Sequence, residues 1–242
     1  MAPLSKTVDW HQYAEKYDML LDYNPFYQQL REEITTMISA WPMEEGDLIA
    51  DLGAGTGNYS VLLAERFPSA RVLHIDNNSA MNARARQKKV AAGLGNLDFI
   101  EKGAEAVSLA PGSLRAILSV HALYTFPDPH QSLRDMYDWL EPGGIGLLVD
   151  PGRIVNVWEW QVAISAHLLK RYGLKRTLRI FQEARVVSEQ NRLIRHQQRK
   201  GELWTHSPEA YRAAIQGAGF EIVESRMCFR GLSDLAVVRK PA

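Results

Sequence analysis

The chain has 242 residues with 28 basic and 28 acidic side chains, and its formal net charge of +0 gives no indication of a general attraction to nucleic acid. Its 46% content of hydrophobic residues is enough to bury the core of one α/β domain with an insertion. The sequence has no run of about 18 apolar residues, no N-terminal signal segment and one cysteine, Cys228, so we expect a cytoplasmic protein without disulfides.

Two helices are predicted in the N-terminal segment, residues 1–41. Asp9 can cap a first helix, and Asn24-Pro25 ends it. This helix carries aromatic residues three or four positions apart on one face: Trp10, Tyr13 and Tyr17. The second helix covers Phe26 to Ile38 and has an apolar stripe. The aromatic side chains either pack the segment onto a sheet or form a lid over a ligand, and the sequence leaves both alternatives open.

A glycine-rich turn follows the first predicted strand. The apolar run from Leu48 ends in Asp51, and Gly53, Gly55 and Gly57 follow at alternate positions. The run predicts a buried strand, and the glycines predict a tight turn into a helix. Glycine lets a ligand approach the main chain, and the amide groups at the start of the helix point toward that ligand. We therefore expect a nucleotide-like cofactor at the end of the first strand of an open α/β sheet.

A second predicted strand, Arg71 to Asp76, also ends in an acid. Asp76 lies 19 residues after Gly57, where a carboxylate can receive ribose hydroxyls. A dinucleotide-binding pattern has Gly or Ala at position 58, whereas this chain has Asn58, and the Gly-Lys-Ser/Thr ending of a Walker loop is absent. Asp51 stands where a phosphate would otherwise lie. The pattern thus favours a ligand with an amino group and a positive sulfur, and it disfavours an NAD(P) oxidoreductase.

The segment from Asp51 to Gly57 reads Asp-Leu-Gly-Ala-Gly-Thr-Gly, which matches the first motif of the class I S-adenosylmethionine-dependent methyltransferases. The chain resembles this family in register over roughly Leu48 to Val149. The resemblance implies a Rossmann-like three-layer α/β sandwich, with a mostly parallel seven-stranded sheet and an antiparallel last strand. It also implies S-adenosyl-L-methionine as cofactor and S-adenosyl-L-homocysteine as product.

The resemblance divides a single domain, residues 1–242, into four parts: a helical lid at 1–41, a cofactor-binding core at 42–151, a helical insertion after strand five that caps the substrate at 152–206, and a last helix with two strands at 207–242.

The cofactor contacts implied by the resemblance lie at the strand ends and in the lid. In the lid, Tyr17 belongs to a Tyr-x-x-x-Tyr-Asp segment, which many small-molecule members share. Position 77 is usually apolar in the family and position 103 is often Asp, whereas this chain has Asn77 and Gly103. The predicted cofactor-binding residues are Tyr17, Asp51, Gly53, Ala54, Gly55, Asp76, Asn77, Met81, Ala104, Glu105, Ser119 and His121.

The remaining core elements are predicted from apolar runs and turn residues. The segment that begins at His121 follows the fourth strand, at the sheet edge where ligands bind in open α/β sheets. The predicted elements are strands at 97–102, 114–120 and 145–149, a helix at 133–140, a turn at Gly143-Gly144, a helix at 207–215, and a hairpin of strands at 221–229 and 233–239.

The insertion combines apolar residues at helical spacing with a concentration of basic residues. Val155, Trp158, Val162 and Leu169 predict one helix, and a second is predicted at 177–198. Between residues 170 and 200, ten basic side chains are opposed only by two glutamates, a net charge of +8. This segment is either a solvated helix face or a site for an anionic acceptor or an acidic membrane surface. RNA is disfavoured because aromatic residues are hardly interleaved with the cations.

The predicted activity is methyl transfer to a small-molecule or lipid-like acceptor, with oxygen, nitrogen or carbon as the methylated atom left open. Asp/Asn-Pro-Pro-Tyr, the motif of nucleic-acid base N-methylation, is absent. A general base is needed only if the acceptor loses a proton, and His121 and then Tyr124 are the candidates by position. The residues predicted to contact the acceptor are His11, Tyr23, Trp158 and His206.

Three further expectations accompany this activity. We expect no metal site and no nucleic-acid partner, and a homodimer is left open. The alternative function is a cofactor-binding scaffold or regulatory subunit that does not transfer methyl groups.

Overall fold

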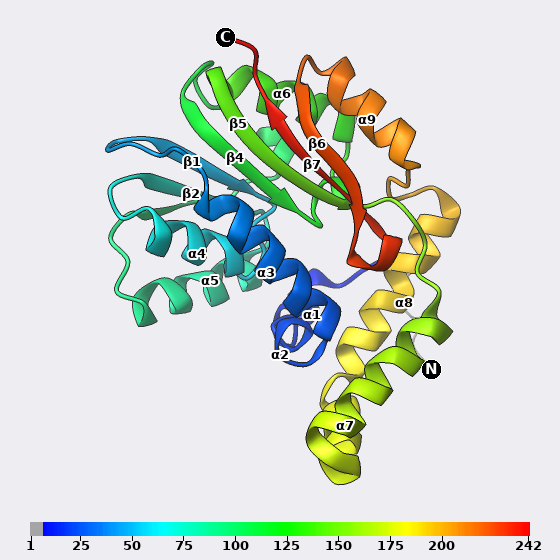
Figure 1. Cartoon of the computed structure of the whole chain (residues 1–242). Helices are drawn as coiled ribbons and strands as arrows, with labels where there is room; N and C mark the ends of the chain where they lie inside the picture. The colour runs from blue at the N-terminus through cyan, green and yellow to red at the C-terminus, as the bar shows by residue number, and fades with distance from the viewer. Residues whose placement is uncertain (1–6) are drawn as a thin grey trace.

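A mostly parallel sheet forms the centre of the computed structural model, which describes residues 7–242 (Figure 1). Within these residues the sheet has seven strands in the order β3-β2-β1-β4-β5-β7-β6. The first five strands pair in parallel, and β7 runs antiparallel to both of its neighbours. The predicted fold class is confirmed. The strands are β1 (Leu48–Leu52), β2 (Arg71–Ile75), β3 (Leu97–Ile100), β4 (Leu114–Val120), β5 (Leu140–Pro151), β6 (Glu221–Cys228) and β7 (Ser233–Arg239).

Helices cover both faces of the sheet and make the structure a three-layer sandwich (Figure 1). On one face, buried residues of α3 and α4 pack with the strands, and on the other those of α6 and α9 do so. Because both faces are covered, β1 and β2 are buried at four consecutive positions each, rather than alternating between buried and exposed residues. The helices of these layers are α3 (Pro25–Ser39), α4 (Asn58–Arg66), α5 (Ser79–Ala91), α6 (Pro129–Trp139) and α9 (Pro208–Gly217).

The order of the strands places a switch point between β1 and β4. From β1 the chain continues to β2 and β3 on one side of the sheet, and β4 and β5 then fill the other side. At such a point the connections diverge and leave a crevice at the carboxyl ends of the strands. Both the glycine turn after β1 and His121 after β4 are located there.

The N-terminal segment folds differently from its prediction. The predicted first helix is interrupted after Ala14, so that α1 (Trp10–Ala14) and α2 (Met19–Tyr23) are separated by a turn. Asp9 does cap α1 by accepting a hydrogen bond from the Gln12 amide at 2.9 Å. Tyr17 therefore lies in a turn and not on a helical stripe. The predicted lid begins at residue 1, and its first six residues lie outside the described part of the chain.

The insertion forms two helices that run side by side, α7 (Val157–Glu183) and α8 (Arg185–Lys200) (Figure 1). The α7 helix is broken at Gly173, which has φ 71° and ψ 172°. The predicted start of the second helix at residue 177 was wrong, because α7 continues to Glu183 and the chain turns at Ala184. Within residues 7–242, no helix combines the length and the apolar character that are needed to cross a bilayer.

The fifth strand is longer than predicted. The expected turn at Gly143-Gly144 lies inside β5, because main-chain hydrogen bonds join Gly143 and Gly144 to Lys240, both at 2.9 Å. The predicted C-terminal hairpin is confirmed, since β6 and β7 pair through a turn at Phe229–Gly231.

Gly53 offers a test of how tightly the glycine turn packs. Its φ is +72°, and an added Cβ would lie 2.2 Å from the Cβ of Ala122. We expect Gly53→Ala to lower the free energy of unfolding by about 3 kcal/mol, because backbone strain adds to overpacking. Gly46→Ala is the matched control: φ is +88°, but nothing lies within 4 Å, so about 1 kcal/mol is expected. Equal losses in urea unfolding would contradict this account.

Candidate functional site

A cavity of about 250 Å³ lies at the carboxyl ends of β1, β2 and β4, over the switch point of the sheet. The glycine turn forms one wall, and the starts of the segments after β2, β3 and β4 form the others. Gly55 has open space where a Cβ would stand, so its main chain is accessible from the cavity. The polar side chains that line the cavity include Asp51, Asn58, Asp76, Asn77, Asn78, Lys102 and Glu105.

Asp76 is held in place by two main-chain amides. Its Oδ2 accepts a hydrogen bond from the Gly55 amide at 2.9 Å, and its Oδ1 accepts one from the Asn78 amide at 2.8 Å. Burial raises the pKa of this carboxyl, while the two amides oppose that rise. Each carboxylate oxygen has further lone pairs, so the group can also accept hydroxyl donors from a ligand in the cavity.

Asp51 begins a chain of buried polar side chains. Its Oδ2 lies 2.6 Å from Ser60 Oγ, which lies 2.9 Å from His74 Nδ1, and His74 Nε2 lies 2.9 Å from Asn82 Oδ1. Burial raises the pKa of Asp51 to about 7 and lowers that of His74 to about 4. Ser60 donates its hydroxyl proton to Asp51 Oδ2, and this hydrogen bond opposes the rise in the pKa of Asp51. With a pKa of about 7, the carboxyl is about half protonated near pH 7.

The turn between α1 and α2 is attached to the glycine turn through Asp18. The Asp18 carboxylate accepts hydrogen bonds from Thr56 Oγ1 at 2.6 Å, Asn58 Nδ2 at 3.0 Å and Lys88 Nζ at 2.9 Å. Burial alone would raise the pKa of Asp18, but these hydrogen bonds lower it below its ordinary value. The attachment places the neighbouring Tyr17 at the cavity wall.

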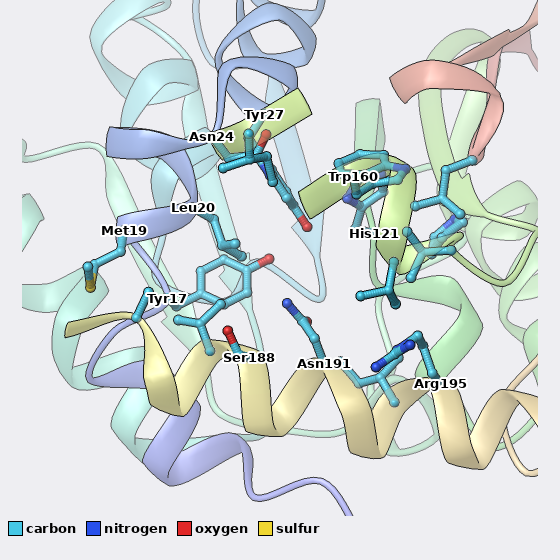
Figure 2. Close-up of a pocket in the computed structure, with 18 of the residues that line it drawn as sticks. Tyr17, Met19, Leu20, Asn24, Tyr27, His121, Trp160, Ser188, Asn191 and Arg195 are labelled. Atoms are coloured by element: carbon cyan, nitrogen blue, oxygen red, sulfur yellow. The ribbon is translucent and has the colours of Figure 1, made fainter. Parts of the chain in front are cut away.

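A second cavity of about 330 Å³ lies beside the first one (Figure 2). Its walls come from the N-terminal helices, from α7 and α8, and from the turns after β4, β5 and β6. Most of the lining is aromatic or aliphatic. The two cavities share four lining residues, Trp10, Tyr17, Tyr27 and His121, and therefore meet at these side chains.

His121 stands at the junction of the two cavities. It has φ 53°, its amide donates to Val149 O at 2.7 Å, and its Nε2 lies 2.9 Å from Ser233 Oγ. Its ring packs against Tyr27 and Phe229, with centroids 5.7 Å and 4.9 Å away. Burial lowers the pKa of His121 to about 4, so the imidazole is neutral at pH 7.

The second cavity carries cations but no carboxylates among the described residues that line it. Arg153 is neutralised by Asp234 at 2.5 Å, whereas Arg195 has no acidic partner in residues 7–242. Figure 2 shows Ser188, Asn191 and Arg195 directed into the space from α8. Gln198, on the same helix, is 7% exposed, and its side-chain amide makes no hydrogen bond within the described residues. This wall is suited to an anionic group on an otherwise apolar ligand.

Comparisons with known proteins agree with this geometry. Residues 49–144 match a family model described as "Methyltransferase domain". The chain is 28% identical over 234 residues to the ubiquinone/menaquinone biosynthesis C-methyltransferase UbiE of Klebsiella pneumoniae, covering 93% of this chain and 86% of that one. The chain belongs to the class I S-adenosylmethionine-dependent methyltransferases.

Other members of the family are similar over different lengths. The trans-aconitate 2-methyltransferase of Paracidovorax citrulli is 33% identical over 130 residues, which cover 51% of this chain and only 48% of that relative. A methyltransferase structure from Aquifex aeolicus superimposes with a TM-score of 0.61 at 13% identity, over 95% of this chain and 97% of that one, which shows the fold alone.

Most residues predicted to bind the methyltransferase cofactor lie around the first cavity. Ser119 is the exception: it is buried below the cavity, where its hydroxyl donates to Leu52 O at 3.0 Å. The predicted residues that line the first cavity are Tyr17, Asp51, Gly53, Ala54, Gly55, Asp76, Asn77, Met81, Ala104, Glu105 and His121.

The structure brings only some of the other predicted residues to the second cavity. Tyr23 and Tyr124 line it, and burial raises the pKa of Tyr124, so its hydroxyl keeps its proton at pH 7. His11 is exposed on α1, and Trp158 is 73% exposed on the outer face of α7. His206 is buried between Asp150 and Asp234, at 3.5 Å and 3.3 Å, and lines neither cavity. These three side chains are therefore not placed to contact an acceptor there.

Several lining residues were missed by sequence reasoning. Tyr27 and Trp160 come from helices whose apolar residues read as ordinary core positions. The four polar residues of α8 did carry a signal: Ser188, Asn191, Arg195 and Gln198 are three or four positions apart and so share one helix face.

The attachment of the lid can be tested at Asp18. We expect Asp18→Ala to speed amide hydrogen exchange in α1 and α2 about tenfold, because three hydrogen bonds that hold this segment are lost. Exchange in α4 should stay unchanged. The matched control is Asp22→Ala, since Asp22 is an exposed acid on α2. Indistinguishable exchange in the two variants would contradict the assigned role of Asp18.

Proposed function

We propose that the protein transfers a methyl group from S-adenosylmethionine to a small organic acid with an apolar body, bound in the second cavity. The observation that carries this proposal is the meeting of two unlike cavities at His121, one with carboxylates and one with cations. Among its relatives, one is named for trans-aconitate and another for C-methylation in ubiquinone and menaquinone biosynthesis. Arg195, which has no acidic partner among residues 7–242, favours an acidic acceptor of the first kind.

The first cavity fits the cofactor by the chemistry of its side chains. S-adenosylmethionine, when bound, supplies a methyl group on a positively charged sulfur. Asp76, already oriented by the Gly55 amide, would hold the ribose hydroxyls, and Asp51 would hold the amino group. Met81 and Ala104 are the apolar neighbours available to adenine. The open space at Gly55 leaves the main chain accessible to the ligand.

In this proposal the chain itself positions the acceptor and excludes water. The aromatic side chains of Tyr17, Tyr27 and Trp160 surround the junction and limit the entry of solvent. Holding an acceptor at the junction removes the entropic cost of a bimolecular encounter, which is worth about 7–11 kcal/mol in the best intramolecular models. Arg195 and Gln198 would orient the acid through its charge and its hydrogen-bond acceptors.

Proton transfer has little part in this proposal. The pKa of His121, lowered to about 4 by burial, makes its imidazole a weak base, and Tyr124 stays protonated at neutral pH. An acceptor that is already deprotonated, such as a carboxylate, needs neither group as a base. His121 and Tyr124 would then orient the acceptor, and their role as a base remains a prediction.

Cofactor affinity should depend on the ionisation of Asp51. The amino group needs a carboxylate, and the pKa of Asp51 is about 7, so binding below that pH requires loss of a proton. We expect S-adenosylhomocysteine to bind about tenfold more weakly at pH 6 than at pH 8 in calorimetric titrations. Asp51→Asn should bind weakly with no such pH dependence. A flat profile for the natural chain would contradict the contact between Asp51 and the amino group.

The acceptor class can be tested with small carboxylic acids, each paired with its primary amide. We expect at least one acid to give S-adenosylhomocysteine. The matching amide should be turned over at least about tenfold more slowly. Arg195→Gln should raise the KM for that acid about tenfold and leave the affinity for S-adenosylhomocysteine unchanged. Arg192→Gln is the matched control, because Arg192 is exposed on the same helix and outside the cavity.

Two outcomes would overturn this proposal. Faster turnover of the amides would exclude an acidic acceptor. Binding of S-adenosylhomocysteine without turnover of any acceptor would support the alternative function, a cofactor-binding scaffold.

A further inference from the structure

The α7 helix exposes an unusual set of large apolar side chains. Of the ten such side chains that are exposed in the described part of the chain, six lie on this helix. Surface patches of this kind on soluble proteins commonly mark interaction sites. The six exposed residues on α7 are Trp158 at 73%, Val162 at 52%, Leu169 at 44%, Leu174 at 66%, Leu178 at 55% and Phe181 at 41%.

The spacing of these residues gives each half of α7 an apolar stripe. Before the break at Gly173, Trp158 and Val162 are four positions apart, and Leu169 follows seven positions after Val162, on the same side of the helix. After the break, Leu174, Leu178 and Phe181 are four and three positions apart. Leu168 and Ile180, each next to a residue of a stripe, are buried and line the second cavity. Phe181 is partly exposed and lines this cavity as well.

Unpaired basic side chains accompany these stripes. Lys170, Arg171, Lys175 and Arg179 are exposed on α7, and none of them has an acidic partner within residues 7–242. Together with α8 they give residues 170–200 ten basic and two acidic side chains, a charge of +8. Because the whole chain is neutral, the remainder carries −8. Three of the six exposed apolar residues, Leu174, Leu178 and Phe181, lie within this strongly positive segment.

We propose that α7 is a docking surface for an anionic lipid bilayer. Helices with Trp, Phe and Leu on one side and Lys and Arg on the other insert their apolar side chains at the boundary of headgroups and acyl chains. Each cation near an anionic leaflet adds about 1 kcal/mol of attraction. A second copy of the chain is a poorer occupant, because pairing two α7 helices would bring two segments of +8 together. The proposal does not depend on the identity of the acceptor.

The test is co-sedimentation of the full chain with vesicles of phosphatidylcholine alone and of phosphatidylcholine with phosphatidylglycerol. We expect binding to the anionic vesicles about tenfold stronger than to the neutral ones, and weaker at high salt. The double variant Trp158→Ser/Leu178→Ser and the charge variant Lys170→Glu/Lys175→Glu should each weaken binding about tenfold.

The matched control is Val223→Ser/Met227→Ser, which replaces two similarly exposed apolar side chains on β6, at 54% and 59%. This control should bind vesicles like the natural chain. Unchanged affinity for S-adenosylhomocysteine will show that each variant is folded. Vesicle binding is measured without methyl transfer, so a failure of the proposed activity would not change the vesicle result. The proposal is overturned by equal binding to both kinds of vesicle, by no binding, or by a dimer in sedimentation velocity that Trp158→Ser/Leu178→Ser converts to monomers.

Discussion

The site depends on how closely the glycine turn after β1 packs against neighbouring side chains. Gly53 and Gly57 have positive φ values and leave no room for a Cβ against Ala122 and Ala85. This path brings the Gly55 amide to the Asp76 carboxylate, which directly follows β2. The same turn presents Thr56 and Asn58 to the N-terminal segment, so one backbone conformation positions both the floor of the first cavity and its lid.

The two cavities are built from parts of the chain with different physical roles. Parallel strands, buried on both faces, fix the carboxylates of the first cavity with little freedom. Peripheral helices, which can vary without disturbing the sheet, provide most of the second cavity. The α7 helix contributes to that wall and also leaves large apolar side chains exposed. A shared cofactor chemistry can thus be combined with an acceptor site specific to this chain.

The sequence was informative where function depends on local backbone geometry. The glycine spacing and the acid at the end of the second strand identified the first cavity, because both are properties of a short stretch of chain. The second cavity depends on contacts between distant segments, such as Tyr13 with Asn191 at 2.8 Å, which no local pattern records. Trp158 illustrates the difficulty: its helical spacing was correct, but spacing alone cannot tell which residues of α7 line the second cavity. His206 was predicted to contact the acceptor, but it is buried between Asp150 and Asp234. These two residues are distant from it in the sequence, so no local pattern indicates the contact.

The most direct test of the central claim is a crystal structure with S-adenosylhomocysteine. The account predicts the ribose hydroxyls within hydrogen-bond distance of the Asp76 carboxylate, the amino group beside Asp51, and the sulfur facing the junction at His121. A product molecule bound elsewhere, or a ribose that makes no contact with Asp76, would contradict it.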